Sequence, residues 1–376
     1  MNPPRTILTV FGTRPEAVKM APVIRALEAD PRYFRSLVCC TGQHEQLVQQ
    51  AMESFGIRAN ITLKAMQAGQ SLGALTSRLF SGLDRAIAEA KPDCVLVQGD
   101  TTSAMAAAMC AFYQRIPVGH VEAGLRSGDR LAPFPEEVNR EVVGRVTQYH
   151  FAPTEGAAAN LRREGVPPAS IHVTGNTVVD ALEMIKPRIE AQADEGIRKL
   201  VAEHVSRRLV LVTTHRRESF GEGIENICRA LLQIVRAHQD VAIVLVTHLN
   251  PHVREPVLRL LGKEPRIALT DPVDYFSLLY LISRADLILT DSGGIQEEAP
   301  SFGKPVLVLR MVTERPEAVE AGYARIVGTD VDAIVGAATE LLRDAVAYSR
   351  MVAKKNPFGD GRAGGRIADV LRKAAS

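Results

Sequence analysis

The regular alternation of short apolar runs with longer amphipathic stretches is the feature that most restricts how this chain can fold. The runs are rich in β-branched residues and largely uninterrupted, which is typical of parallel strands buried on both faces of a sheet. The pattern predicts strands at Thr6–Phe11, Ser36–Cys40, Cys94–Gln98, Pro117–Val121, Tyr149–Phe151, Ile171–Val173, Leu209–Thr213, Val241–Val246, Ile267–Leu269, Leu287–Thr290, Pro305–Leu309 and Ala324–Val327.

The stretches between these runs have the periodicity of helices, as at Ser71–Ala90, Ser103–Arg115, Ile224–Ala237 and Asp330–Leu342. Parallel strands joined by helices form doubly wound sheets. At 376 residues the chain exceeds the usual size of a single core. We therefore predict an α/β protein with two Rossmann-like domains facing a cleft, at 1–174 and 175–360, and a last helix at 361–376 that packs on the first domain.

Composition excludes several classes of protein. The formal net charge of +2 lacks the basic excess of a nucleic-acid-binding protein. No apolar run approaches the roughly 20 residues that span a bilayer, and the first apolar stretch is shorter than the core of a signal peptide. The five cysteines are scattered without metal-ligand spacing, which predicts buried thiols in a cytoplasmic protein. We expect neither nucleic acid nor a membrane as a partner.

Unusual polar clusters follow almost every predicted strand. They read FGTRPEAVK at 11–19, TGQHEQ at 41–46, QGDTT at 98–102, VEAGLRS at 121–127, TTHRRES at 213–219, THLNP at 247–251, TDSGGIQEE at 290–298 and RMVTERPE at 310–317. In open parallel sheets, ligands bind beyond the carboxyl ends of the strands. The loops of two such domains therefore predict one binding site in a shared cleft.

Ser292, Gly293 and Gly294 lie between a predicted strand and the start of a helix. Glycines there let a ligand approach the backbone, and the N–H groups of a helix N-terminus favour an anion. The alternative is an ordinary turn in which Ser292 is the N-cap. Arg14 and His215 also follow strands, and such cations beside a helix N-terminus would hold a diphosphate. A glutamate at 297 or 298 would then accept hydrogen bonds from a ribose.

Three carboxylates, Asp100, Glu122 and Glu136, form a second group of candidates. Acids placed beyond neighbouring strands can converge on a substrate, where proximity or burial raises the pKa of a carboxyl and permits proton exchange near neutral pH. Asp100 could instead cap the helix near Ser103, and Glu136 could favour a helix N-terminus. No histidine and carboxylate set has metal spacing, and no G-x-G-x-x-G opens a helix, so no metal or cofactor is expected.

Together these motifs make the chain resemble the bacterial non-hydrolysing UDP-N-acetylglucosamine (UDP-GlcNAc) 2-epimerases. The resemblance runs through almost the whole chain, from FGTRPEAVKMAP, QGDTTS, HVEAGLRS and PFPEEVNR to HRRES, TDSGGIQEEAPSFGKPVLVLR, TERPEAVEAG and NPFGDG. It implies a GT-B-like pair of Rossmann domains with UDP bound mainly by the second. It also implies a homodimer, a UDP-sugar substrate and an isomerase reaction serving cell-surface polysaccharide biosynthesis.

The resemblance also implies roles for most of the candidate residues. The diphosphate contacts would be Arg14, His215, Ser292 and Gly293, with Glu298 as the ribose contact and Arg315 as a further site residue. The catalytic positions would be Lys19, Asp100, Glu122, Glu136 and His215. Elimination of UDP to a 2-acetamidoglucal, followed by re-addition, would invert carbon 2 of the sugar.

Departures from the family pattern keep other activities open. Ser219 stands where the family usually has asparagine, and Met311 with Val312 stands where an aspartate and a threonine are common. The alternatives are an epimerase for a modified UDP-sugar such as a diacetamido-uronic acid derivative, a hydrolysing epimerase, a GT-B glycosyltransferase and a non-catalytic UDP-sugar sensor.

One departure concerns regulation. Many members of the family bind a second UDP-GlcNAc as an activator through two glutamines, matched here by Gln43 and Gln46, and through an arginine. Gly69 occupies the position of that arginine. The resemblance therefore implies the glutamine part of an allosteric site without its cation.

Overall fold

The chain forms two compact units, Met1–Ile185 with Phe358–Ser376, and Lys186–Pro357. The computed structural model describes residues 3–42, 45–67, 69–214, 220–352 and 355–374, and the side chains of residues 45–47 also lie outside this description. The division falls at Ile185 rather than at Thr174, because helix α7 (Thr177–Ile185) packs against helix α1 (Arg14–Glu28) of the first unit. The C-terminal helix α17 (Ala363–Lys373) packs against α1 as well.

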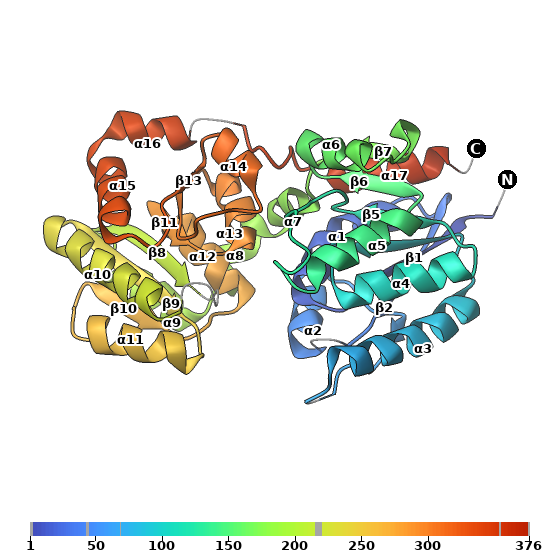
Figure 1. Cartoon of the computed structure of the whole chain (residues 1–376), viewed down its shortest axis with the longest axis horizontal. Coiled ribbons are helices and arrows are strands. Elements are labelled where there is room, and N and C mark those ends of the chain that lie inside the picture. The colour runs from blue at the N-terminus through green and yellow to red at the C-terminus, as the bar shows by residue number, and fades with distance from the viewer. Residues whose placement is uncertain (1–2, 43–44, 68, 215–219, 353–354, 375–376) are drawn as a thin grey trace. The chain divides into compact units, whose positions relative to one another are not determined.

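The first unit contains a seven-stranded parallel sheet in the order β3-β2-β1-β4-β5-β6-β7. Its strands are β1 (Arg5–Phe11), β2 (Phe34–Cys40), β3 (Ile61–Thr62), β4 (Cys94–Gln98), β5 (Val118–Val121), β6 (Tyr149–Ala152) and β7 (Ile171–Val173). Its other helices are α2 (Glu45–Ser54), α3 (Leu72–Ala90), α4 (Thr102–Tyr113), α5 (Glu136–Val146) and α6 (Glu155–Arg163). On one face α3, α4 and α5 pack side by side, and on the other α1 packs with α2, α7 and α17 (Figure 1).

The second unit contains a six-stranded parallel sheet in the order β10-β9-β8-β11-β12-β13. Its strands are β8 (Arg208–Thr214), β9 (Val241–Thr247), β10 (Ile267–Thr270), β11 (Leu287–Thr290), β12 (Val306–Val308) and β13 (Ala324–Ile326). Its helices are α8 (Ile189–Gln192), α9 (Glu195–Glu203), α10 (Glu222–Ala237), α11 (Pro251–Leu261), α12 (Tyr275–Arg284), α13 (Gly293–Glu298), α14 (Pro316–Glu320), α15 (Val331–Arg343) and α16 (Ala345–Val352). Short 3₁₀ helices lie at Pro168–Ser170 in the first unit and at Lys186–Arg188 and Ala299–Phe302 in the second.

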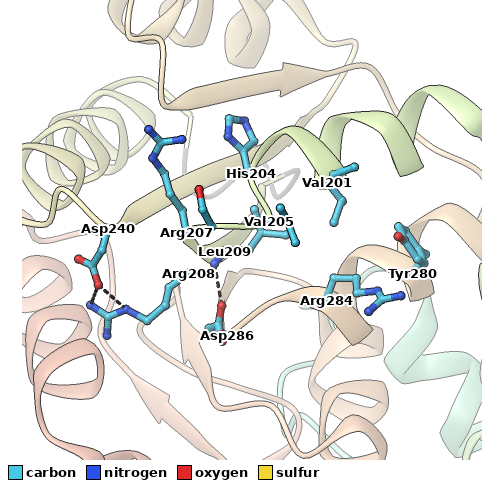
Figure 2. A pocket seen from close by; sticks show the side chains of 12 residues that line it. Val201, His204, Val205, Arg207, Arg208, Leu209, Asp240, Tyr280, Arg284 and Asp286 are labelled. Atoms are coloured by element: carbon cyan, nitrogen blue, oxygen red, sulfur yellow. Dashed lines mark hydrogen bonds and ion pairs between the residues drawn. The ribbon is translucent and has the colours of Figure 1, made fainter.

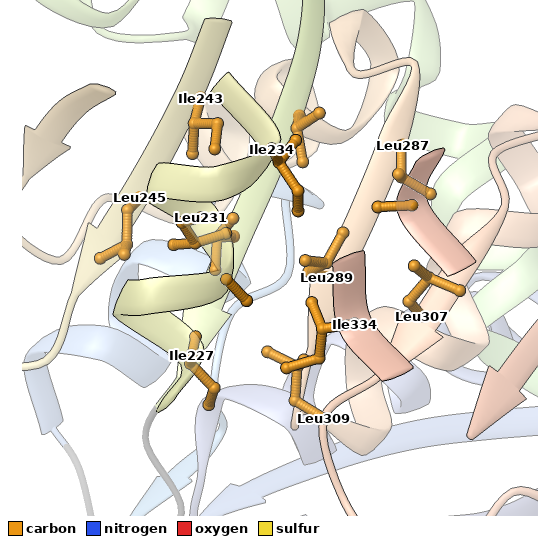
Figure 3. Packing of buried hydrophobic residues seen from close by; sticks show 14 of the residues in the cluster. Ile227, Leu231, Ile234, Ile243, Leu245, Leu287, Leu289, Leu307, Leu309 and Ile334 are labelled. Carbon is orange, nitrogen blue, oxygen red and sulfur yellow. The ribbon is translucent and has the colours of Figure 1, made fainter. Parts of the chain in front are cut away.

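The core of the second unit shows why its strands are apolar along their whole length. Leu231 and Ile234 of α10 pack against Leu289 of β11 and Ile334 of α15 in one buried cluster (Figure 3). The α12 helix packs with α8 and α9 in a separate group. Helices therefore cover the central strands, which are buried along almost their whole length.

In both sheets the strand order reverses at one point, between β1 and β4 in the first and between β8 and β11 in the second. Open α/β sheets bind ligands beyond the carboxyl ends of the strands at such a reversal. The segments that follow β1 and β4 contain Arg14, Lys19 and Asp100, and the segment after β11 contains Ser292 and Gly293. The topology thus places these five predicted residues in the segments that follow the strands at the two reversals.

The predicted fold class is confirmed, and each predicted strand is present with bounds that shift by at most a few residues. Strand β3 escaped prediction because two residues, Ile61–Thr62, are too short to display an alternating pattern. Ser71 and Asp330, predicted as the first residues of helices, are N-caps whose side chains accept backbone hydrogen bonds. Within the described residues, none of the helices combines the length and apolar character required to cross a bilayer.

Candidate functional site

The carboxyl group of Glu16 links the two segments that flank the reversal in the first sheet. Its Oε2 accepts hydrogen bonds from the backbone N–H groups of Gly12 and Thr13, at 3.0 and 2.8 Å, and from the Thr13 hydroxyl at 2.8 Å. Its Oε1 accepts a 2.7 Å hydrogen bond from the hydroxyl of Thr101. Burial raises the pKa of Glu16 to about 7, although these hydrogen bonds act to lower it. Glu16 therefore ties the loop after β1 to the loop after β4.

The backbone around Asp100 is fixed by neighbouring elements. The Nε2 of His120 donates a 2.8 Å hydrogen bond to the carbonyl of Gly99, and the N–H of Gly99 donates to the carbonyl of Val121 at 3.1 Å. The side-chain amide of Asn139 donates to the carbonyl of Asp100 at 2.8 Å. Burial lowers the pKa of His120 to about 3, so the ring is neutral and its proton is on Nε2. Asp100 is therefore presented from a tightly bonded loop.

Lys19 and Glu122 form an ion pair between α1 and the segment after β5. The two side chains are 10% and 8% exposed, so the pair lies largely out of water. Glu122 has a φ of 67°, in the left-handed region that residues with a side chain rarely occupy. Such conformations persist only where the surroundings impose them, often at functional sites. The hydrogen bond from Gly99 to Val121 places the segments that begin with Asp100 and Glu122 side by side.

Arg140 bridges Asp100 and Glu137. One terminal nitrogen of the guanidinium lies 2.5 Å from Oδ2 of Asp100, and the other lies 2.7 Å from Oε2 of Glu137. The second oxygen of Glu137 accepts the N–H groups of Ser127 and Gly128 at 2.9 and 3.1 Å. The side chain of Asp100 remains 25% exposed, whereas those of Arg140 and Glu137 are 7% and 1% exposed. A buried pair of charges therefore supports an accessible carboxylate.

Glu136 is the first residue of α5, and the same helix supplies Asn139 and Arg140 to Asp100. Its place in the first turn fits the alternative that it stabilises a helix N-terminus. Its Oε2, however, is buried and has no hydrogen-bond partner among the described residues. A buried carboxyl oxygen without a partner is costly unless a ligand contacts it, which favours a role in binding or catalysis.

Two alternative capping roles can be compared directly with the structure. Thr101, and not Asp100, is the N-cap of α4, and its hydroxyl accepts the N–H of Ala104 at 3.1 Å. Ser292 occupies the N-cap position of α13, but its side chain accepts no capping hydrogen bond. The side chains of Asp100 and Ser292 therefore form no capping hydrogen bond with the helices that follow them.

In the second unit, Arg315 lies beside the start of α13. A β-carbon added to Gly293 would lie 3.8 Å from the guanidinium carbon of Arg315. The Nε of Arg315 donates to Oε1 of Glu297 at 2.5 Å, and both side chains are buried. The ion pair holds the guanidinium close to the N–H groups that open α13, and both features attract an anion.

Glu298 differs from the neighbouring Glu297 in the partner that the fold gives it. The hydroxyl of Tyr275 donates to Oε1 of Glu298 at 3.1 Å, whereas Glu297 is paired with Arg315. A carboxylate has about four lone-pair sites, so one that accepts from a neutral hydroxyl can take further donors. Glu298 is therefore bonded to a neutral hydroxyl, whereas Glu297 is bonded to a cation.

Several predicted residues cannot be placed with the others. His215 and Gln43 lie outside the residues that the structure describes, and so does the side chain of Gln46. Arg14 is the half-buried first residue of α1. Gly69 has a φ of 70°, which suits glycine and disfavours an arginine in this backbone conformation.

All five cysteines are buried thiols, as predicted. Burial raises the pKa of Cys39, Cys94 and Cys228 to about 12. Thiols of this kind are poor nucleophiles at neutral pH. Over the part of the chain that the structure describes, no group of three histidine, cysteine or carboxylate side chains could hold a metal ion.

A cavity of about 610 Å³ in the second unit lies away from the candidate residues. Figure 2 shows Arg208 paired with Asp240, and Asp286 accepting the N–H of Leu209, at the points where β8, β9 and β11 begin. Ser292 follows the opposite, carboxyl end of β11. This cavity is therefore at the other edge of the sheet.

Glu16, Arg140 and Tyr275 are not among the residues predicted from the sequence. Glu16 had a readable signal, because Thr13 and Glu16 have the spacing of a capping box at the start of α1. The other two residues had none, since their partners Asp100 and Glu298 come from distant segments. Only the packing of the elements brings these pairs together.

Two doubly wound parallel sheets, with charged side chains gathered at the carboxyl ends of their strands, define a two-unit α/β protein of the GT-B-like class. A family model described as UDP-N-acetylglucosamine 2-epimerase matches residues 25–372. The chain belongs to the UDP-N-acetylglucosamine 2-epimerase family.

Individual relatives agree with this assignment. Over 370 residues the chain is 52% identical to a UDP-N-acetylglucosamine 2-epimerase of Escherichia coli K12, which covers 97% of this chain and 98% of that protein. It is similar to the solved UDP-GlcNAc 2-epimerase of Neisseria meningitidis bound to UDP-GlcNAc, with a TM-score of 0.90 and 44% identity. The match covers 98% of this chain and 100% of that protein. It is also similar to the Staphylococcus aureus protein MnaA solved with UDP, with a TM-score of 0.88 and 42% identity. That match covers 99% of this chain and 97% of the other protein.

Proposed function

We propose that this protein interconverts UDP-GlcNAc and UDP-N-acetylmannosamine as a non-hydrolysing 2-epimerase. The observation that carries the proposal is the position of Lys19, Asp100 and Glu122 beyond the carboxyl ends of the neighbouring strands β1, β4 and β5, with Lys19 paired to Glu122. Relatives 52% and 51% identical to the chain are named as epimerases for this sugar nucleotide, and the Neisseria meningitidis relative was solved with UDP-GlcNAc.

The order of steps follows from the chemistry of the sugar. The hydrogen on carbon 2 is not next to a carbonyl, so a carboxylate cannot remove it from the intact substrate. Departure of UDP breaks the bond from carbon 1 to oxygen, leaves the electron pair on the diphosphate and produces an oxocarbenium-like ring. A carboxylate then takes the acidified proton from carbon 2, and the double bond of a 2-acetamidoglucal forms. Re-addition of UDP to carbon 1, with protonation of carbon 2 from the opposite face, yields the manno epimer.

The second unit supplies the groups for the leaving diphosphate. Arg315 and the N-terminus of α13 at Ser292 and Gly293 would stabilise the developing negative charge, together with His215 of the same unit. The family resemblance adds Arg14 of the first unit as a further diphosphate contact. Such preorganised electrostatic stabilisation is usually the largest single contribution to catalysis. Glu298 would accept hydrogen bonds from the ribose and so fix the nucleotide.

The first unit supplies the groups for proton transfer. Inversion requires removal of a proton from one face of carbon 2 and delivery to the other. Asp100, Glu122 and Glu136 are the acid and base candidates, and Lys19 balances the charge of Glu122. Each well-placed proton-transfer group contributes roughly a hundred- to ten-thousand-fold in rate.

A modified UDP-sugar is the second candidate substrate. Met311 and Val312 are 81% and 70% exposed, and they precede Arg315 in the segment after β12. Two exposed apolar side chains in place of a polar pair would suit a sugar with an additional acetamido group better than a hydroxyl. A panel of UDP-GlcNAc and UDP-diacetamido sugars, compared by kcat/KM, separates the two candidates.

Proton NMR of UDP-GlcNAc with the purified protein in deuterium oxide tests the reaction. We expect the manno anomer to appear with deuterium at carbon 2. A product without deuterium would reject elimination and re-addition, and free N-acetylmannosamine with UDP would indicate a hydrolysing enzyme. Turnover only with an added acceptor would indicate a glycosyltransferase, and UDP-GlcNAc binding without turnover would indicate a sensor.

We further propose, from the family resemblance, that the protein is a cytoplasmic homodimer that needs no cofactor. Because Gly69 replaces the arginine of the allosteric site, we also propose that UDP-GlcNAc does not activate the enzyme. Light scattering at micromolar concentration measures the mass of the assembly. A hyperbolic initial rate against UDP-GlcNAc concentration is expected, and a sigmoidal one would show that activation is retained without the arginine.

A further inference from the structure

We propose that Arg140, braced by Glu137, is a positioning residue that aims the carboxylate of Asp100 for proton transfer. The inference rests on the proposed function, because it assigns Asp100 to the reacting sugar. It adds to that function a residue that acts through Asp100 and need not touch the substrate.

The first support is the placement of three residues on one face of α5. Glu136, Asn139 and Arg140 are separated by three and four positions, which places them on the same side of a helix. Asn139 bonds to the backbone carbonyl of Asp100 at 2.8 Å, and Arg140 bonds to its side chain at 2.5 Å. One rigid helix thus holds Asp100 at two points and also carries Glu136.

The second support is the way the guanidinium divides the oxygens of Asp100. Arg140 contacts Oδ2, whereas Oδ1 has no partner among the residues that the structure describes, and the side chain is 25% exposed. The guanidinium of arginine is planar and always charged, so its contact fixes the direction of the carboxylate. One oxygen is thereby anchored and the other is left to accept a proton.

The third support is that Arg140 is itself immobilised. Its second terminal nitrogen bonds to Glu137, whose side chain is 1% exposed. Glu137 accepts the N–H groups of Ser127 and Gly128 through its other oxygen, so it cannot turn away without losing them. Arg140 is therefore held from one side by Glu137 while it contacts Asp100 on the other.

The test compares Arg140→Lys with Arg145→Lys, an exposed arginine near the end of the same helix whose guanidinium bonds to the carbonyl of Glu164 at 3.4 Å. Lysine keeps the charge but cannot bond to two carboxylates through a planar fork. We expect kcat of Arg140→Lys to fall about 100-fold, within the range for a misplaced proton-transfer group. Its KM and the dissociation constant of UDP should stay within about threefold of the wild type, since ground-state binding is unchanged. Arg145→Lys should match the wild type in all three quantities.

A rescue experiment provides a readout that a purely structural residue would not give. Guanidinium ion added to Arg140→Ala should restore at least tenfold in kcat, and the same addition to Asp100→Asn should restore nothing. A kcat of Arg140→Lys equal to that of Arg145→Lys, or a parallel loss of UDP affinity, would overturn the inference, as would the absence of rescue. Failure of the wild type to epimerise UDP-GlcNAc would instead reject the proposed function, so the two failures are distinguishable.

Discussion

The ammonium group of Lys19 is paired with Oε2 of Glu122, and the pair is nearly excluded from water, with 10% and 8% of the two side chains exposed. Removing one member leaves the other as a buried charge without its partner, which typically costs about 3–5 kcal/mol. We therefore expect Lys19→Met and Glu122→Gln each to lower the free energy of unfolding by about 3 kcal/mol. Because both charges are gone in the double variant, its loss should be smaller than the sum. Urea denaturation of the four proteins measures the coupling, and additive losses would contradict it.

Glu16 predicts a pH dependence of stability. Its pKa is about 7 in the folded protein, against 4.5 for a glutamate exposed to water, so the folded state binds more protons between these values. The free energy of unfolding should therefore be highest below pH 4.5 with respect to this group, fall as pH rises towards 7, and then level off. Between the low-pH and high-pH limits, the contribution of Glu16 to the free energy of unfolding changes by on the order of 3 kcal/mol.

Glu16→Gln should remove this dependence of stability on pH, because glutamine does not titrate. The fold should accept the change, since the amide oxygen of glutamine can still accept from Thr13 and its amide nitrogen can donate to Thr101. Glu28→Gln, which changes an exposed glutamate of the same helix, should keep the wild-type slope. Urea midpoints at pH 5, 6, 7 and 8 provide the comparison. An unchanged slope in Glu16→Gln would show that another group is responsible.

Gly293→Ala should separate stability from nucleotide binding. The added methyl would lie at an ordinary contact distance of 3.8 Å from Arg315, so the fold should accept it. Replacing a helical glycine by alanine commonly stabilises by about 0.4–1 kcal/mol. The methyl would nevertheless occupy the approach of the diphosphate to α13, and UDP affinity should fall about tenfold, or ~1.4 kcal/mol.

Gly336→Ala, inside α15 and with no neighbouring atom in the way, is the matched control. It should gain similar stability and leave UDP affinity unchanged. Thermal melts and calorimetric titration with UDP measure the two effects. Equal UDP affinity in both variants would place the diphosphate elsewhere.

Tyr275→Phe tests the role of Glu298. Loss of the 3.1 Å hydrogen bond from Tyr275 to Oε1 should let the carboxylate of Glu298 move. Its hydrogen bonds to the ribose should then weaken equally in the ground state and in the transition state. We expect KM to rise about fivefold with little change in kcat, the signature of lost uniform binding. Tyr323→Phe removes a comparable hydrogen bond, to the carbonyl of Val352, and should leave KM unchanged. A fall in kcat without a change in KM would contradict this assignment.

Much of the site was predictable because its residues lie next to strand ends in the sequence. Asp100 and Ser292 could be singled out by their place after apolar runs, and the fold places both at the reversals of strand order. What each carboxylate bonds to was not predictable. Glu297 and Glu298 are adjacent in sequence, yet one is paired with Arg315 and the other with Tyr275.

The sequence by itself determined the two doubly wound sheets and the edge at which polar residues gather, because hydrophobic periodicity and strand-to-helix order are local properties of a chain. Only the tertiary structure decided which charges are paired, which oxygens remain open and which backbone conformations are strained. Arg140 meets Asp100, and Lys19 meets Glu122, through contacts between elements far apart in the sequence. Such pairings depend on the packing of helices on the sheet, and no local pattern encodes them.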